Sequence, residues 1–327
     1  MPRHLYAQIN SFPLRRAFTI SRGAKTEADV VTCTLTENGV SGRGECVPYK
    51  RYGETVEGVL AAIEAMAGAI ADGMTRVELQ SAMKPGAARN AIDCALWDLE
   101  AKLTGARVSM TACRVPPRPV PTAVTISLGD PADMADEARA HSAQKVLKVK
   151  VGTSDDRARM HAVASAARGA EIILDANEGW DESNIREHLL LAAELHIGLI
   201  EQPLPAGKDE ILAHIPHPVP ICADESVHTL DDLQALADRY DAINIKLDKT
   251  GGLTEALLMR DRARELGFGV MIGCMVGTSL AMAPAVLLAQ DADWVDLDGP
   301  LLLARDRIPG LVYTGSLVSP PSSDLWG

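Results

Sequence analysis

The chain has 327 residues, of which 47% are hydrophobic and 23% are charged, a composition typical of folded globular proteins. Lysine and arginine number 32 against 44 aspartates and glutamates, so the formal net charge is −12. This charge argues against nucleic acid or an anionic membrane surface as the main partner. The N-terminus lacks the apolar core of a signal peptide, and no apolar stretch reaches about 18 uncharged residues, so we expect a cytoplasmic protein.

Residues 1–115 predict an α+β module. Its apolar patterns indicate antiparallel strands followed by two helices, at 8–20, 29–48, 56–70 and 87–103. Glu37-Asn38-Gly39 is typical of a hairpin turn, and Gly105 of a residue that ends a helix. The proline-rich segment 115–121 marks a domain boundary. The apolar tail 305–327 is expected to pack back on this first domain.

A regular repeat follows in residues 116–304, which we expect to form the second domain. Charged residues end consecutive apolar runs at 150, 175, 201, 224 and 246, with gaps of 25, 26, 23 and 22 residues. One strand, one helix and two loops need about that much chain. Eight strands are predicted, at 122–128, 146–151, 171–176, 197–202, 219–224, 241–247, 268–274 and 293–298. The fold class is therefore a modified (β/α)8 TIM barrel with an N-terminal α+β capping domain completed by the C-terminal tail.

Two lysines share one face of the second predicted strand. Lys148 and Lys150 alternate with Leu147, Val149 and Val151, so both lysines should point toward the barrel axis. A solvated pair on an edge strand is the alternative, but a closed barrel leaves no edge. Two neighbouring ammonium groups should disfavour each other's charge, which lowers one pKa toward that of a usable base.

Three carboxylates end consecutive predicted strands: Asp175, Glu201 and Asp224. Any one of them could instead cap a helix, but three in phase indicate a metal site. Ligation by oxygen alone selects Mg²⁺ first and Mn²⁺ second, and it makes zinc a poor candidate. Asn177 and Glu225 are candidates to hydrogen-bond these ligands from outside.

Lys246 lies one strand further on, across the ring from the lysine pair. A substrate carboxylate bound to metal between two lysines suits removal of a proton from the adjacent α-carbon. The metal would stabilise the resulting enediolate, and the lysine opposite could return a proton to either face.

Together these residues resemble the muconate-lactonising subgroup of the enolase superfamily. The motifs are KVK at 148–150, DAN at 175–177, EQP at 201–203, ADES at 223–226, NIKLDKTGG at 244–252 and ARNAIDCALWDLEAKLTG at 88–105. A lysine base with Mg²⁺ on an enediolate is a general scheme of that superfamily. The resemblance spans essentially the whole chain and implies that Lys150 and Lys246 are the two bases, with Lys148 tuning Lys150.

The last predicted strand and the first loop point to the substrate. Asp296 and Asp298 should both face the barrel mouth, and they resemble the D-x-D pair that holds a free α-ammonium group in dipeptide epimerases; capping of an Asp-Gly-Pro turn is the alternative. Arg22 shares a loop with Lys25 and resembles the clamp on a glutamate side-chain carboxylate, against the alternative of an ordinary surface arginine. Thr125 is a weaker candidate for a backbone or carboxylate contact.

The expected function is a Mg²⁺-dependent dipeptide epimerase of the L-Ala-D/L-Glu type, an isomerase whose dipeptide substrate would come from cell-wall peptide. Two rivals remain open. One keeps the chemistry and changes the substrate, as in N-acylamino acid racemases and o-succinylbenzoate synthases. The other is a non-catalytic protein that binds metal or a dipeptide on the same scaffold. The expected partner is a small dipeptide, and a homo-oligomer stays possible.

Overall fold

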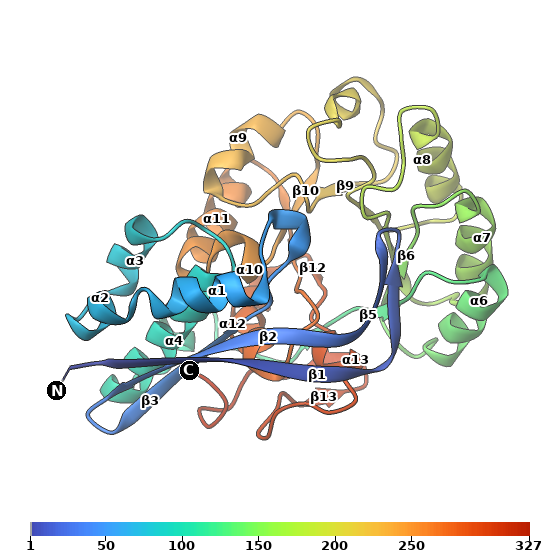
Figure 1. Ribbon diagram of the computed structural model, residues 1–327. Helices are drawn as coiled ribbons and strands as arrows, with labels where there is room; N and C mark the ends of the chain where they lie inside the picture. The colour runs from blue at the N-terminus through green and yellow to red at the C-terminus, as the bar shows by residue number, and fades with distance from the viewer. Residues whose placement is uncertain (1) are drawn as a thin grey trace.

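The computed structural model describes residues 2–327, which comprise an N-terminal region, a barrel region and a C-terminal tail (Figure 1). An N-terminal region (residues 2–115) holds an antiparallel sheet with helices on one side of it. A barrel region (residues 116–304) holds an eight-stranded parallel sheet that curls on itself. The predicted fold class is confirmed.

The barrel strands run in sequence order around the sheet, and every neighbouring pair is parallel. The strands are β5 (Val124–Ile126), β6 (Val146–Lys150), β7 (Glu171–Asp175), β8 (Leu199–Glu201), β9 (Ile221–Ala223), β10 (Ala242–Ile245), β11 (Gly269–Ile272) and β12 (Trp294–Val295). Each lies inside its predicted interval. The backbone N–H of Ala123 donates to Val295 O at 2.8 Å, so the first and last strands meet.

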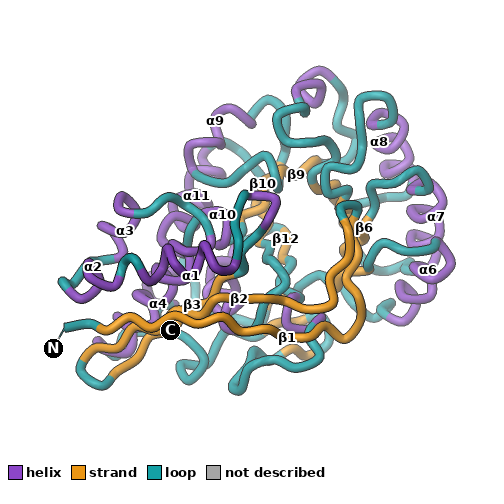
Figure 2. Tube along the Cα trace, viewed as in Figure 1, coloured by secondary structure: helices purple, strands orange, loops and turns teal. Residues whose placement is uncertain are grey.

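Helices cover the outside of the curled sheet, as the purple segments beside β6 show (Figure 2). The helical segments of residues 116–304 are α6 (Pro131–Ala140), α7 (Asp156–Ala166), α8 (Ile185–Glu194), η2 (Glu210–His214), η3 (Leu230–Asp232), α9 (Leu233–Leu236), α10 (Leu247–Thr250), α11 (Leu253–Glu265), α12 (Ser279–Leu288), η4 (Ala289–Asp291) and α13 (Gly299–Leu302). Apolar residues such as Leu147, Leu174 and Ile243 face these helices and form the largest core.

The inside of the barrel is divided into two layers. The lower layer is a buried apolar cluster, formed by Ile173, Leu199, Cys222, Ala242 and Met271. Side chains of a strand alternate between its faces, so the residue two positions further along points inward as well. After the first four of these residues, that position is charged or polar, which places the side chains of Asp175, Glu201, Asp224 and Asn244 together at the carboxyl ends of the strands.

The N-terminal region is a three-stranded sheet of β1 (His4–Ile20), β2 (Gly23–Glu37) and β3 (Val40–Cys46), with η1 (Lys50–Tyr52), α1 (Val56–Glu64), α2 (Ala67–Ala71), α3 (Arg76–Ala82), α4 (Ala87–Thr104) and α5 (Ser109–Ala112). As predicted, Asn38 and Gly39 form the turn between β2 and β3, with φ of 52° and 79°, and Gly105 ends α4 with φ of 71°. Helix α4 lies so close to β3 that a Cβ on Gly44 would be 2.1 Å from Ala91 O.

The β1–β2 hairpin reaches over the barrel, and its tip turns toward β6 (Figure 1). A bulge between Pro13 and Phe18 bends the hairpin. Two hydrogen bonds hold the tip against the barrel: Leu128 N donates to Thr19 O at 3.1 Å, and Ser21 Oγ donates to Asn177 O at 3.1 Å. The hairpin therefore forms one wall above the charged layer.

The C-terminal tail contacts both the barrel region and the N-terminal region. Strands β13 (Tyr313–Thr314) and β14 (Leu317–Val318) form a small sheet with β4 (Val120–Pro121). Further on, Trp326 Nε1 donates to Cys94 O on α4 at 3.0 Å, and Val108 N donates to Gly327 O at 3.1 Å. Among the helices of residues 2–327, none is long and apolar enough to cross a membrane.

Candidate active site

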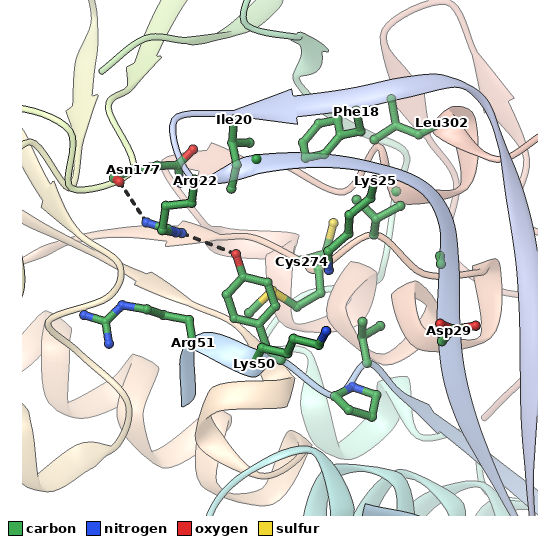
Figure 3. A pocket seen from close by; sticks show the side chains of 18 of the residues that line it. Phe18, Ile20, Arg22, Lys25, Asp29, Lys50, Arg51, Asn177, Cys274 and Leu302 are labelled. Carbon is green, nitrogen blue, oxygen red and sulfur yellow. Dashed lines mark hydrogen bonds between the residues drawn. The ribbon is translucent and has the colours of Figure 1, made fainter. Parts of the chain in front are cut away.

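A cavity of about 1080 Å³ lies between the hairpin tip, the loop that carries η1, and the carboxyl ends of the barrel strands. The N-terminal region contributes Phe18, Ile20, Arg22, Lys25, Tyr49 and Tyr52 to its wall. The barrel contributes Lys148, Lys150, Asp224, Lys246, Asp296 and Asp298. Figure 3 shows the hairpin residues above this space and Lys50 and Arg51 below them. The cavity is therefore shared between the two regions.

Lys148 lies at the centre of the charged layer. Its Nζ is 3.1 Å from Asp175 Oδ2, 2.7 Å from Glu201 Oε2 and 2.8 Å from Asp296 Oδ2. Burial opposes the charge of this lysine, but Asp296, Glu201 and Asp175 outweigh burial and hold the pKa of Lys148 well above its usual value. The expected lowering of one pKa within the lysine pair therefore does not occur at Lys148, because three carboxylates surround it.

The two predicted bases lie against different carboxylates. Lys150 Nζ donates to Asp175 Oδ2 at 2.6 Å, and Lys246 Nζ donates to Asp224 Oδ2 at 2.6 Å. Strands β7, β8 and β9 separate the strands that carry these lysines, β6 and β10. The lysines thus approach the cavity from two sides, with the carboxylates between them.

A fourth lysine, which the sequence analysis did not assign, shares Asp224 with Lys246. Lys249 is buried, and its Nζ donates to Asp224 Oδ1 at 2.6 Å, to Asp224 O at 2.6 Å and to Asn244 O at 3.0 Å. All three of its donors are therefore used. The signal was present in the segment NIKLDKTGG, where this second lysine follows Lys246 by three residues.

The three carboxylates are fully buried, and their charges are unequally compensated. Burial opposes ionisation of Asp224, but Lys246 and Lys249 outweigh burial and hold its pKa well below the usual value. Burial and then the charge of Asp175 raise the pKa of Glu201 to about 7, although Lys148 acts in the opposite direction. Negative charge around Glu201 is thus left partly uncompensated by the lysines.

This donor set fits a hard divalent cation. The carboxylates come from adjacent strands, with Asp175 paired to Glu201 in the β7–β8 register, and neither His nor Cys is among them, which favours Mg²⁺. A cation would also compensate the charge that raises the pKa of Glu201. Within residues 2–327 no group of three or more His, Cys, Asp or Glu side chains is arranged as a metal-binding cluster, since lysine ammonium groups lie between the carboxylates.

Asp296 and Asp298 follow β12 and are both buried. Asp296 Oδ2 is bound by Lys148, while its buried Oδ1 has no hydrogen-bond partner among the described residues. Asp298 Oδ2 accepts from Thr125 N at 2.7 Å, so Thr125 orients this aspartate through its backbone. Burial and the charge of Asp296 raise the pKa of Asp298 to about 7. Lys148 therefore compensates one oxygen of Asp296, whereas Asp298 and the Oδ1 of Asp296 have no cation bound to them.

The two residues expected to support the metal ligands take different positions. Asn177 contacts Asp175 through its backbone, since Asn177 N donates to Asp175 Oδ1 at 2.9 Å. Glu225 makes an ion pair with Arg22, with 2.7 Å between Nη2 and Oε1. Arg22 lines the cavity, and its Nη atoms bind the barrel loops and the Tyr49 hydroxyl (Figure 3).

Comparison with known proteins identifies the family. The mandelate racemase/muconate lactonizing enzyme N-terminal domain matches residues 5–110, and the enolase C-terminal domain-like family matches residues 132–298. An L-Ala-D/L-Glu epimerase from Escherichia coli (strain K12) is 45% identical over 306 residues, which are 93% of this chain and 95% of that protein. An N-acetyl-D-glutamate racemase from Pseudoalteromonas sp. is 43% identical over 300 residues, which are 91% of this chain and 95% of that protein.

One solved structure is nearly superposable on the chain. It is an enolase family member from Agrobacterium tumefaciens with homology to dipeptide epimerases, crystallised with bound sodium and L-Ala-L-Glu, and it is 62% identical with a TM-score of 0.99 over 100% of both chains. The chain therefore belongs to the mandelate racemase/muconate lactonizing enzyme family of the enolase superfamily.

Proposed function

We propose that this chain is a Mg²⁺-dependent dipeptide epimerase of the L-Ala-D/L-Glu type, which inverts the α-carbon of the C-terminal residue. The observation that carries the proposal is the placement of Lys150 and Lys246 on two sides of one cavity, each beside a carboxylate of the same buried set. A protein that only binds its ligand needs no base on each face. The relatives that are named epimerase or racemase support this function.

The lysines supply the proton transfer. One of them removes the α-proton from its face of the carbon, and the other donates a proton to the opposite face, so the configuration inverts. Lys148, held by three carboxylates, stays charged and fixes their positions. Asp175, Glu201 and Asp224 would hold Mg²⁺, which supplies electrostatic stabilisation of the charge that develops on the substrate carboxylate.

Asp296 and Asp298 would bind the free ammonium group of the dipeptide. The unpartnered Asp296 Oδ1 is an available acceptor, and a cationic ligand would relieve the repulsion that raises the pKa of Asp298. For the glutamate side chain, Lys25 is better placed than Arg22. Lys25 makes no ion pair with any residue in 2–327; its Nζ lies over the Tyr49 ring, 5.1 Å from the centroid.

The two-base assignment is tested by proton exchange in deuterium oxide. Lys150→Ala and Lys246→Ala should each abolish epimerisation of Ala-Glu with Mg²⁺ present, because one face loses its proton donor. Each variant should still exchange the α-proton of one epimer with solvent. The epimer that still exchanges should differ between the two variants. Proton NMR of both epimers measures this. If both variants spared the same epimer, the assignment of opposite faces would be wrong.

N-acetylglutamate racemisation is the second candidate, because the relative with that activity in its name is nearly as similar as the E. coli epimerase. The site favours the dipeptide, since a neutral acetyl group leaves Asp298 and the Oδ1 of Asp296 without a cation. Comparing kcat/KM for N-acetylglutamate with kcat/KM for Ala-Glu decides between the two candidate functions.

The remaining expectations are part of the same proposal. Residues 1–115 with 305–327 would form the capping domain, and residues 116–304 the catalytic domain. The substrate would derive from cell-wall peptide, and the protein would be cytoplasmic. The six free cysteines agree with a reducing compartment. A homo-oligomer is compatible with these assignments and would be measured by light scattering.

A further inference from the structure

Arg22 projects from the hairpin tip and has all four of its Nη hydrogens engaged by the protein. Nη1 donates to Asn177 O at 2.7 Å and to Glu178 Oε2 at 3.1 Å. Nη2 donates to Glu225 Oε1 at 2.7 Å and to Tyr49 Oη at 3.3 Å. The dashed bonds in Figure 3 show Arg22 between Asn177 and a tyrosine ring. A guanidinium held in this way cannot also form a bidentate ion pair with a substrate carboxylate.

The partners of Arg22 lie in the loops that directly follow two proposed metal ligands. Asn177 and Glu178 come two and three residues after Asp175, and Glu225 comes directly after Asp224. One side chain of the N-terminal region therefore connects the loop after β7 to the loop after β9. Residues next to a ligand on the same short loop determine where the ligand oxygens lie.

The loop after β7 has a backbone conformation that needs external support. Asn177 and Glu178 have φ of 44° and 66°, and two consecutive non-glycine residues in this region are unusual. The bond from Arg22 to Asn177 O fixes the first of them. Arg51 binds the second through both Glu178 oxygens, at 2.9 and 2.8 Å. The strained turn is thus held from outside the barrel.

The loop after β9 depends on Arg22 for its charge balance. The Glu225 side chain is only 1% exposed, and Arg22 is the cation paired with it. Without that cation, a buried carboxylate would be left uncompensated beside Asp224. The loop would then no longer be held in place, and the position of Asp224 would be disturbed.

We propose that Arg22 is a positioning residue that fixes the loops carrying the metal ligands when the hairpin lies over the barrel, and that it is not the clamp for the substrate side chain. The inference rests on the proposed metal site. It assigns a role in metal affinity to a residue of the hairpin. Asp175 and Asp224 would then be correctly placed for the metal only when the hairpin lies over the barrel.

Calorimetry of Mg²⁺ binding to the full chain without substrate tests the proposal. Arg22→Met should weaken Mg²⁺ binding by about tenfold or more, the usual effect of removing a residue that orients metal ligands. Arg16→Met is the matched control: it removes an exposed ion pair between the hairpin and Glu137 on α6, which touches neither ligand loop, and it should weaken binding by less than about threefold. Unchanged Mg²⁺ affinity in Arg22→Met would overturn the proposal.

Substrate choice supplies the second readout. The ratio of kcat/KM for Ala-Glu over Ala-Gln should stay within about twofold of wild type in Arg22→Met, and it should fall by about tenfold or more in Lys25→Met. A tenfold fall of that ratio in Arg22→Met would instead identify Arg22 as the residue that binds the substrate side-chain carboxylate, and it would contradict the proposal. If Arg22→Met does not fold by circular dichroism, the double variant Arg22→Met/Glu225→Gln is used in both assays instead. This double variant lacks the buried charge of Glu225. Inactivity of the wild type on every dipeptide would refute the proposed function and leave the Mg²⁺ result standing.

Discussion

Replacing Asp298 with asparagine should selectively weaken catalysis on substrates with a free amino terminus. Asp298 is buried, and Thr125 N holds its Oδ2, so the side chain is fixed and an asparagine can take its place with Oδ1 toward Thr125. A hydrogen bond to a charged group contributes about 1.5–3 kcal/mol, which corresponds to about 10- to 100-fold in kcat/KM for Ala-Glu. Activity on N-acetylglutamate should change much less, because that substrate has no ammonium group.

The wild-type protein should already discriminate between these two substrates. N-acetylglutamate has no ammonium group for Asp296 and Asp298 to bind. Its kcat/KM should therefore be about 10²- to 10⁴-fold lower than that of Ala-Glu, which corresponds to about 3–6 kcal/mol. Proton NMR in deuterium oxide, with each substrate at several concentrations, measures both rates in one experiment. Equal turnover of Ala-Glu and N-acetylglutamate by the wild type would refute the ammonium site and make the protein a racemase of acylated amino acids.

Two further predictions concern groups around the site. Lys249→Met removes the buried ammonium group that fixes Asp224, so Mg²⁺ should bind about tenfold or more weakly by calorimetry and the melting temperature should fall; wild-type affinity would contradict this role. Asp248, whose pKa burial raises to about 7, accepts hydrogen bonds from Val47 N and Asn90 Nδ2 at a single oxygen, which asparagine preserves. Its protonated form stabilises the folded state below about pH 4, and this contribution, up to about 4 kcal/mol, is lost as the pH rises through 7. Because this loss proceeds between about pH 4 and about pH 7, Asp248→Asn should resist urea better than wild type at pH 8 and by less than half of that margin at pH 5. A difference independent of pH would exclude the titration of Asp248 as its cause.

The fold was predictable because its signals are local. Apolar runs that end in charges at nearly constant spacing define parallel strands and their carboxyl ends, and each barrel strand was found inside its interval. The alternation of Lys148 and Lys150 with aliphatic neighbours likewise assigned their faces. The sequence alone could therefore predict where a strand lies, which way its side chains point and where it ends, because a short stretch of chain determines each of these.

The pairings inside the site were not predictable in the same way. Lys148 was expected to act on Lys150, yet its Nζ lies among Asp175, Glu201 and Asp296, which come from three other strand ends. Which carboxylate a lysine meets depends on side-chain conformations across the barrel, and no sequence spacing encodes them. Arg22 is a similar case, because three of its four partners are more than 150 residues away in the other region of the molecule.

The site separates the chemistry from the choice of substrate. The lysines and carboxylates project from strands of one closed sheet, whereas Arg22 and Lys25 belong to the hairpin above it. The two relatives named above act, by their names, on L-Ala-D/L-Glu and on N-acetyl-D-glutamate. Both substrates contain a glutamate whose α-nitrogen is acylated, so one proton transfer at the α-carbon serves both, and they differ only beyond the acyl carbonyl. In our proposal that end of the substrate meets Asp298. A change at this one position should therefore shift the protein between the two substrate classes while both lysines continue to work, so the ratio of the two activities reports on the ammonium site more sharply than either activity alone.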